Sequence, residues 1–446
     1  MNHNFITKTI GELRDYISEN RTFLRYDVSD FYNSYNKAMK KFNRSKHRNM
    51  FIYELLDSLL NSLDSKLSSQ IKKDLHSKDF NWFKRIGQYF FFNLTQWYGC
   101  INPNGQDILS LFNATRKDFF EKWWKYFLRF EQNQRTENED TPSYPEKVLL
   151  ELTNNCNLNC IMCGIGAYGY DKSRNMSLDL VDRLSKHVLS KVKTIRINGL
   201  GESTIIPNIL EYLQKIFSLN KQLEIVTNLT VQNENLWSRL LNKHTNMLIS
   251  CDSADPQTYE TIRRGANFNS FLKNLKFIGE NINHPLQAQI IFTLMKQNLD
   301  DLPEVIELSS QHNLGGVVVN VVKLDTMDYF SKKEIDTIKQ TFEKSYNLAR
   351  DYGLSLKLPD HIGNVPINSQ ISTKTCKEFC SNPGNEVYIR YNGDLTPCNM
   401  LNPYIYGNLE LDSFSNLWTG LNASIFRHFL NTHHRHHYCR NCYYLL

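Results

Sequence analysis

Apolar residues recur along the chain with two different periods, and the change between them divides the sequence. From residue 8 to about 131 they recur every three or four positions, as in FIYELLDSLLNSLDSKL and DFFEKWWKYFLRF, which is the spacing of an amphipathic helix. We therefore predict an all-helical N-terminal domain over residues 1–131. The polar, proline-containing stretch over residues 132–146 predicts a linker.

Beyond the linker, short apolar runs alternate with amphipathic segments. VLLELT, TIRING, LEIVTN, MLISCDS, QAQIIFTL and GVVVNVVK predict strands, and helical patterns separate them. Parallel strands need a crossover, which a helix supplies. Residues 147–325 are therefore predicted to be α/β, a partial (β/α)6 barrel with its chemistry at the carboxyl ends of the strands. Residues 326–446 predict a helix and then a small cysteine-containing domain.

Composition places the chain among ordinary globular proteins, with 41% hydrophobic residues, 22% charged residues and a net charge of +6. The basic runs are typical of solvated helix faces, so nucleic-acid binding is not favoured. No run reaches the roughly 18 apolar residues needed to cross a bilayer, and no secretory signal pattern is present. We expect a cytosolic protein in which ten cysteines, many at short spacings, indicate metal binding rather than disulfides.

Three cysteines, Cys156, Cys160 and Cys163, directly follow the first predicted strand. Four-iron clusters and structural zinc sites ordinarily take four protein ligands, so a compact set of three leaves one metal corner open. Either a distant residue or a bound substrate fills that corner. The position at the carboxyl end of a strand is where a barrel of this kind has its active site.

The spacing C-x3-C-x2-C at this position resembles that of the radical S-adenosylmethionine (radical SAM) enzymes. The resemblance implies that the three thiolates hold a 4Fe-4S cluster whose open iron is chelated by the amino and carboxylate groups of SAM. It also implies the reaction: an electron from the cluster cleaves SAM, and the resulting 5'-deoxyadenosyl radical abstracts hydrogen from a C–H bond. A donor such as flavodoxin or ferredoxin would supply that electron.

Other strand ends match motifs of the same family. NGLGES resembles its Gly-Gly-Glu motif, which implies that Gly201 and Glu202 hold the SAM ammonium, although Leu200 replaces the first glycine. In SCDS, Ser250 and Asp252 would lie near the ribose, since alternate strand residues point the same way.

The same resemblance suggests three more candidate residues for the SAM site. TYETIRRGANF resembles a segment whose arginine approaches the SAM carboxylate, here Arg263. Met162 occupies a position usually held by an aromatic residue that packs on the adenine. Asn228 ends the third predicted strand, where it either faces the pocket or forms a turn or helix cap.

The C-terminal region holds a second group of cysteines. VYIRY and DLTPC flank an Asn-Gly turn, which predicts a hairpin. The cysteine spacing around this hairpin and in the final YCRNC resembles the SPASM or twitch extension of radical SAM enzymes, which implies one auxiliary 4Fe-4S cluster. Its expected ligands are Cys380, Cys398, Cys439 and Cys442.

Several alternatives stay open at this second site. Zinc competes with a cluster, because paired cysteines beside the histidines of NTHHRHHYCRNC also suit structural zinc. Cys376 competes with Cys380 as a ligand, or it is a catalytic hydrogen-atom donor, the role of a pocket thiol in radical epimerases. Cys251 lies between two inward-pointing positions and is expected to be a small buried hydrophobe that faces the helices.

The sequence thus predicts a radical SAM enzyme that oxidises or epimerises a small, sugar- or nucleotide-like molecule. A peptide- or protein-modifying maturase is the alternative, and it is weakened because residues 1–131 lack the strand pattern of a winged peptide-recognition module. A non-catalytic iron-sulfur or zinc protein is the alternative of another class. Such a protein would have no use for an open iron corner beside Glu202.

Overall fold

The structure is a computed structural model, and it describes residues 142–163, 174–322, 330–359, 361–362, 365–367, 380, 382–399, 405–410, 412–430 and 439. The predicted helical domain over residues 1–131 lies outside the described residues. The chain divides into two compact units. The first, here called the barrel unit, is Tyr144–Asn399 with Asn441–Leu446, and the second is Met1–Ser143 with Met400–Arg440.

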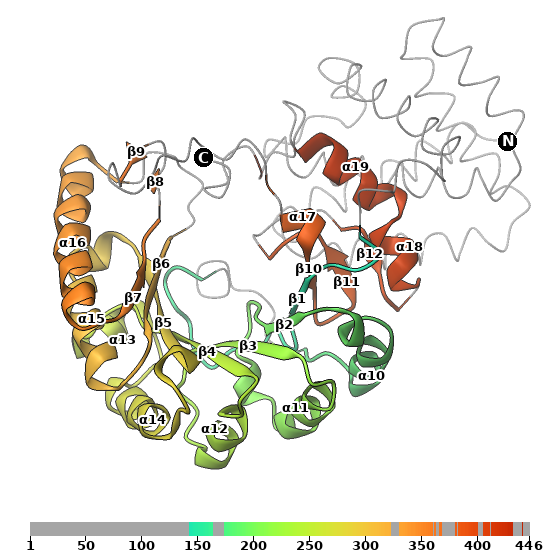
Figure 1. Cartoon of the computed structure of the whole chain (residues 1–446), viewed down its shortest axis with the longest axis horizontal. Helices are drawn as coiled ribbons and strands as arrows, with labels where there is room; N and C mark the ends of the chain where they lie inside the picture. The colour runs from blue at the N-terminus through green and yellow to red at the C-terminus, as the bar shows by residue number, and fades with distance from the viewer. Residues whose placement is uncertain are drawn as a thin grey trace, which may run out of the picture. The chain divides into compact units, whose positions relative to one another are not determined.

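Parallel strands form the centre of the barrel unit, side by side in chain order. They are β1 (Lys147–Leu150), β2 (Thr194–Ile197), β3 (Gln222–Thr227), β4 (Thr245–Ser250), β5 (Ala288–Leu294), β6 (Gly316–Val321) and β7 (Ser355–Lys357). Each pairs in parallel with the next, and the sheet curls into the partial barrel of Figure 1. The six predicted strands are all present, and β7 is an addition too short to be predicted from its pattern.

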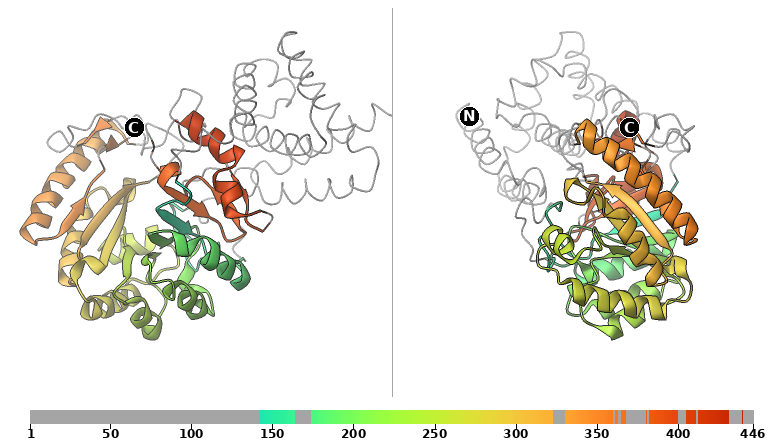
Figure 2. Two further views of the ribbon diagram at one scale, coloured as in Figure 1. Left: turned by 45° about the vertical axis from the view of Figure 1, so that its right-hand side comes forward. Right: turned by 90° about the vertical axis from the view of Figure 1, so that its left-hand side faces the viewer.

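Helices cover the convex face of this sheet, as Figures 1 and 2 show. They are α10 (Leu178–His187), α11 (Ile209–Phe217), α12 (Glu234–Leu240), α13 (Pro256–Ile262), α14 (Phe268–Asn281) and α15 (Leu302–Gln311), with α16 (Lys332–Asp351) beside α15 and β7. Side-chain caps begin many of them: Ser177, Asn233, Asp255, Asn267 and Ser331 each accept the amide three residues on. Among the described helices, none has the length and apolar character needed to span a bilayer.

Short segments complete the barrel unit between and beyond these elements. Single 3₁₀ turns occur at Leu189–Lys191, Ser203–Ile205, Pro285–Gln287 and Lys296–Asn298. After α16 come the paired strands β8 (His361–Ile362) and β9 (Val365–Pro366), and then α17 (Asn382–Asn385).

A strand from the C-terminal region extends the sheet beyond β1. β10 (Glu386–Ile389) pairs in parallel with β1, and β11 (Asp394–Thr396) pairs antiparallel with β10. Gly393 has a φ of 84° in the turn between them, a conformation that glycine adopts without strain. This is the hairpin that the Asn-Gly turn predicts. The sheet therefore continues through β7 and β10, past the boundary that we predicted at residue 325.

The second unit contains β12 (Gly407–Asn408), α18 (Phe414–Trp418) and α19 (Leu421–Leu430). Trp418 donates its indole Nε1–H to the carbonyl of Pro142 at 2.7 Å. The guanidinium of Arg427 lies 4.0 Å from the centre of the Trp418 ring and donates to the Trp418 carbonyl at 2.8 Å. A cation held over an indole face is attracted by the ring, so these contacts fix Pro142 to the C-terminal helices.

Side chains alternate in burial along the barrel strands. On one face they are fully buried, as Ile195, Ile225, Ile249 and Ile290 are. On the concave face they are only half-buried, and many are polar. The half-buried polar residues include Lys147, Arg196, Glu224, Asn246, Gln289 and Asn320.

Three of them form one ion-pair network across β1, β2 and β3. Lys147 Nζ lies 3.1 Å from Glu224 Oε2, and Arg196 Nε binds the same oxygen. Burial acts to raise the pKa of Glu224, but the two cations and their hydrogen bonds outweigh it and hold that pKa below its ordinary value. The concave face thus carries charged side chains that are paired with one another in the first half of these strands.

We predict that Glu224→Gln lowers the free energy of unfolding at neutral pH by roughly 1–2 kcal/mol, because Lys147 and Arg196 then lose the carboxylate that binds both of them. A carboxylate whose pKa falls on folding stabilises the native state above its unfolded pKa, and this contribution is lost as pH falls through the folded-state pKa. The difference in the free energy of unfolding between the variant and the unmodified protein should therefore shrink below pH 4.5, the ordinary pKa of glutamate. Urea unfolding at descending pH checks this, and a constant difference would contradict it.

Candidate active site

The loop after β1 carries the three cysteines of the C-x3-C-x2-C motif. Cys160 is buried, Cys156 and Cys163 are half-buried, and none of the three forms a disulfide. The amide of Cys163 donates to the carbonyl of Cys160 at 3.2 Å, and the amide of Leu158 donates to Cys156 Sγ at 3.4 Å. Met162 lies half-buried between the second and third cysteines.

The three thiols are close enough to influence one another. Burial raises the pKa of the Cys160 thiol to about 12, the Arg263 guanidinium opposes this, and Cys163, Asp252 and Cys156 add to it. Within the described residues, no three His, Cys, Asp or Glu side chains converge as ligands of a single metal ion. A 4Fe-4S cluster takes one thiolate at each corner, so its ligands surround a volume rather than a point. The donor set on this loop, three cysteines without disulfide bonds, fits such a cluster.

The end of β2 holds one side of this loop. The amide of Glu202 donates to the carbonyl of Asn155 at 2.8 Å. A Cβ added to Gly201 would lie 2.3 Å from the carbonyl oxygen of Thr153 and 2.6 Å from that of Asn155. No other residue type permits this approach. Gly201 therefore positions the cysteine loop through its lack of a side chain.

The segment that ends α13 holds the other side of the loop. Two backbone hydrogen bonds join this segment to the loop. The amide of Asn159 donates to the carbonyl of Arg264 at 2.8 Å, and the amide of Ile161 donates to the carbonyl of Ile262 at 2.9 Å. The bonded residues flank Cys160 in the loop and Arg263 in the opposite segment. The buried cysteine and the arginine are thus held against each other by main-chain geometry.

Asn228, at the end of β3, forms a turn and also contacts the loop. Its Oδ1 accepts the amide of Thr230 at 3.1 Å, and its Nδ2 donates to Asn157 Oδ1 at 3.0 Å. Leu229 follows with a φ of 56°, a left-handed conformation that costs a non-glycine residue about 1 kcal/mol or more. Asn274 Nδ2 donates to the carbonyl of Leu229 at 2.8 Å and holds the strained turn.

The carboxylate of Glu202 joins the ends of β2 and β3, and its residue is only 4% exposed. Oε1 accepts the hydroxyls of Thr204 at 2.7 Å and Thr227 at 3.0 Å, and Oε2 accepts the amide of Asn228 at 2.6 Å. Burial raises the pKa of Glu202, and these donors oppose the rise. Since each carboxylate oxygen can accept two hydrogen bonds, Oε2 can also accept one from a bound ammonium.

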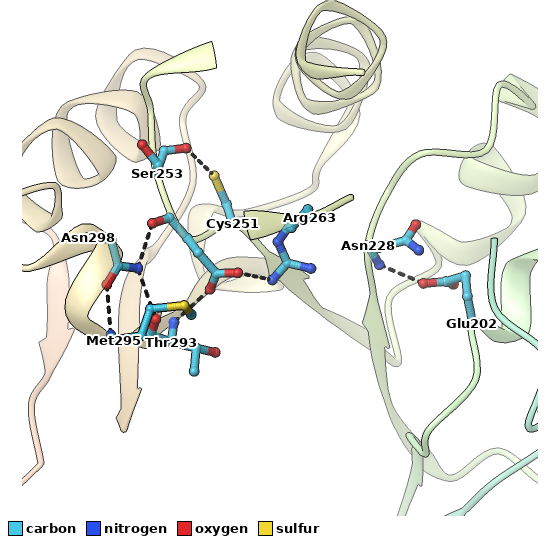
Figure 3. Close-up of polar contacts among 9 residues, drawn as sticks. Glu202, Asn228, Cys251, Ser253, Arg263, Thr293, Met295 and Asn298 are labelled. Carbon is cyan, nitrogen blue, oxygen red and sulfur yellow. Dashed lines mark hydrogen bonds and ion pairs between the residues drawn. The ribbon is translucent and has the colours of Figure 1, made fainter. Parts of the chain in front are cut away.

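Asp252 does not have the environment that we expected. It is fully buried, its Oδ2 lies 2.7 Å from Arg263 Nη2, and its Oδ1 accepts the amide of Thr293 at 2.8 Å. Figure 3 shows the guanidinium of Arg263 turned toward this carboxylate. The carboxylate is therefore engaged by protein groups rather than directed at a ribose. Ser250 lies on the half-buried concave face, as alternation predicts.

Arg263 closes α13 and is 5% exposed. In the described part of the chain, neither its Nε nor the hydroxyl of Tyr259 has a hydrogen-bond partner. Buried donors left unpaired cost about 1–3 kcal/mol each. Such donors beside the cysteine loop fit a bound anionic group, such as the carboxylate of an amino acid.

Cys251 is a fully buried thiol, and its Sγ donates to the carbonyl of Ser253 at 3.2 Å (Figure 3).

The auxiliary cysteines are divided between the two units: Cys380 and Cys398 are half-buried in the barrel unit, and Cys439 is buried in the second. Cys376 and Cys442 lie outside the described residues.

Glu151, directly after β1, is a buried carboxylate that our sequence analysis missed. Its Oε1 accepts the amide of Leu200 at 3.3 Å, and its Oε2 lies 3.8 Å from Arg390 Nε, next to β10. Burial raises the pKa of Glu151, while Arg390 and the hydroxyl of Tyr388 oppose the rise. A Cβ on Gly199 would lie 2.5 Å from Glu151 Cγ. No local pattern marks this set, because Arg390 is distant in sequence.

Comparison with known families gives the class of the protein. Residues 150–309 match the radical SAM superfamily, and residues 380–443 match SPASM, an iron-sulfur cluster-binding domain. Residues 150–309 are therefore a radical SAM domain, and residues 380–443 are a SPASM domain. The prediction of SAM with an iron-sulfur cluster is confirmed at the level of these domains, and the second match favours an iron-sulfur cluster over zinc.

Individual relatives are distant. A tungsten-containing aldehyde ferredoxin oxidoreductase cofactor-modifying protein of Pyrococcus furiosus is 23% identical over 66% of this chain and 86% of its own. An AdoMet-dependent heme synthase of Methanosarcina barkeri is 24% identical over 64% of this chain and 84% of its own. The structure of SuiB of Streptococcus suis bound to SAM has a TM-score of 0.53 and 15% sequence identity, and the match covers 71% of this chain and 80% of SuiB. The structure of SuiB bound to its precursor peptide SuiA has a TM-score of 0.51 and 15% identity, and that match covers 76% of this chain and 80% of SuiB. The structural likeness shows the shared fold.

We predict that Gly201→Ala prevents cluster assembly in the cysteine loop, because the added methyl group would collide with two main-chain carbonyls. About four irons per chain should be lost after anaerobic reconstitution, while the circular dichroism spectrum stays unchanged. Gly384→Ala is the matched control, since a Cβ there meets nothing within 4 Å. Full iron content in Gly201→Ala would show that the close approach is dispensable.

Proposed function

We propose that Cys156, Cys160 and Cys163 hold a 4Fe-4S cluster and that the enzyme oxidises or epimerises a polar small molecule of sugar- or nucleotide-like character. The observation that carries the proposal is the cysteine loop at the end of β1, held between the segments that carry Glu202 and Arg263. When bound, the cluster and SAM supply a 5'-deoxyadenosyl radical that abstracts hydrogen from a C–H bond.

The residues around the loop supply complementary charges for the amino-acid part of SAM. The open acceptor position on Glu202 Oε2 suits the ammonium, and the unpartnered Nε of Arg263 suits the carboxylate. Asp252 fixes the orientation of Arg263. All three side chains are buried, so charge interactions in this region are strong and little screened by water.

The concave face of the barrel mixes polar and apolar positions. Towards the carboxyl ends of the strands, the half-buried polar residues Ser250 and Thr293 accompany the half-buried apolar residues Val226, Leu248 and Ile291. Small-molecule sites use a few such groups to fix orientation. Two of the relatives are described as a cofactor-modifying protein and a heme synthase, which favours a small molecule over a peptide.

The SPASM domain is proposed to hold one auxiliary 4Fe-4S cluster, with Cys380, Cys398, Cys439 and Cys442 as its ligands. An auxiliary cluster can accept an electron from a substrate radical, which is what oxidation requires and epimerisation does not. A flavodoxin or ferredoxin is the proposed electron donor to the first cluster.

The first test combines iron analysis with SAM cleavage. We predict that changing Cys156, Cys160 and Cys163 together to Ala lowers the iron content from about eight to about four per chain. The reduced variant should form no 5'-deoxyadenosine from SAM, whereas the unmodified enzyme forms it with dithionite. Chromatography of quenched reactions measures this product. Formation of 5'-deoxyadenosine by the triple variant would exclude the proposed cluster site.

A second test addresses the substrate. Radical formation is expected to accelerate when the correct molecule is bound, so 5'-deoxyadenosine is measured with a panel of nucleotides and nucleotide sugars and, separately, with short peptides. Stimulation by a nucleotide or sugar, with deuterium transferred from the labelled compound into 5'-deoxyadenosine, supports the proposal. Stimulation and transfer confined to peptides would replace it with the maturase alternative.

A further inference from the structure

Cys160 differs from the other two cysteines of the loop in its surroundings. It is 8% exposed, whereas Cys156 and Cys163 are half-buried. Two main-chain hydrogen bonds flank it on the loop and flank Arg263 on the opposite segment. The most buried of the three proposed ligands therefore lies opposite Arg263 in the neighbouring segment, and Arg263 is itself 5% exposed.

The charge on Arg263 is neither exposed to solvent nor free to move. Its guanidinium lies 2.7 Å from Asp252 Oδ2, with the two side chains 6% and 0% exposed. Asp252 is held in turn by the amide of Thr293 at 2.8 Å, and its carbonyl accepts Asn298 Nδ2 at 2.8 Å (Figure 3). The pair is therefore a rigid dipole in a region that water does not screen.

Main-chain hydrogen bonds place this pair beside the loop. The bonds from the amides of Asn159 and Ile161 to the opposite segment set Arg263 across from Cys160. Among the described residues, Asp252 is joined to the loop side only through its ion pair with Arg263, so the cation is the member of the pair that stands opposite the cysteine. The neighbouring Cys251 and Tyr259 are uncharged at neutral pH, because burial raises the pKa of each well above it.

We propose that the Arg263–Asp252 pair, held beside Cys160, sets the reduction potential of the first cluster, with Arg263 raising the potential and Asp252 moderating it. The proposal rests on Cys156, Cys160 and Cys163 as the cluster ligands. Net charge and hydrogen bonds at the cluster sulfurs are among the factors that set such potentials. Reduction adds one negative charge, which a nearby buried cation stabilises and a nearby carboxylate opposes. This role is separate from contact with SAM, because it acts on the cluster when SAM is absent.

The test is an anaerobic redox titration without SAM, monitored by electron paramagnetic resonance. The signal of interest is the one that the triple cysteine variant lacks. Arg263→Gln should make reduction less favourable by at least tenfold in the equilibrium constant, about 59 mV for one electron. Asp252→Asn should shift the potential in the opposite direction, because the amide keeps the contact with Thr293 but loses the charge. Arg263→Lys, which keeps the cation, should stay near the unmodified value.

Controls separate this effect from general damage. Lys215→Gln removes a cation from the surface pair with Asp182 and should leave the potential unchanged. Arg263→Gln leaves a buried carboxylate unpaired, which commonly destabilises a fold by about 3–5 kcal/mol. Asp252→Asn leaves the buried Arg263 cation unpaired in the same way. If either single variant fails to assemble a cluster, the double variant Arg263→Gln/Asp252→Asn, which buries no unpaired charge, carries the test, and its potential should lie below that of the unmodified protein.

The outcomes distinguish the two levels of the proposal. Opposite shifts in Arg263→Gln and Asp252→Asn support it, since a purely structural role predicts no change of sign. No shift in Asp252→Asn, or a shift to lower potential, overturns the inference while the cluster assignment stands. If the triple cysteine variant retains every iron-sulfur signal, the cluster assignment itself is wrong.

Discussion

The close approach of main chain to main chain at Gly201 is the constraint on which the proposed active site depends. The cysteine loop has no regular secondary structure, so its shape comes from what it rests on. At Gly201 the end of β2 comes so near the carbonyls of Thr153 and Asn155 that a methyl group would not fit. The loop then meets Asn228 at the end of β3 and the Arg263 segment on its far side. Because these supports belong to separate βα units, the loop can take this shape only after the barrel has closed around it.

Much of the barrel could be predicted from the sequence, because the relevant signals are local. Alternation of apolar runs and amphipathic segments identifies β1 to β6 and their helices, and the Asn-Gly turn identifies the β10–β11 hairpin. The cysteine spacing identifies the class of chemistry. All of these depend on neighbours within about ten residues, where periodicity and turn chemistry are informative.

Pairings between distant segments could not be predicted in this way. β7 has three residues, and the partnership of β1 with β10 has no local signature. Asp252 was expected near a ribose because its strand position points inward, but a buried cation from α13 engages its carboxylate. Glu151 was overlooked because a glutamate after a strand is unremarkable until Arg390 is brought beside it. The role of a buried charge is determined by its tertiary partner, and a single sequence does not show that partner.

The pairing of β1 with β10 has a consequence for biosynthesis. Lys147 through Leu150 align with Glu386 through Ile389, so one edge of β1 has no partner until the ribosome has made the chain as far as β10. Open strand edges invite pairing with other chains, and non-local pairings form slowly. The strand left exposed is the one that leads into the cysteine loop. Nascent chains should therefore depend on chaperones, and iron loading before release would place metal in a loop whose strand is still incomplete.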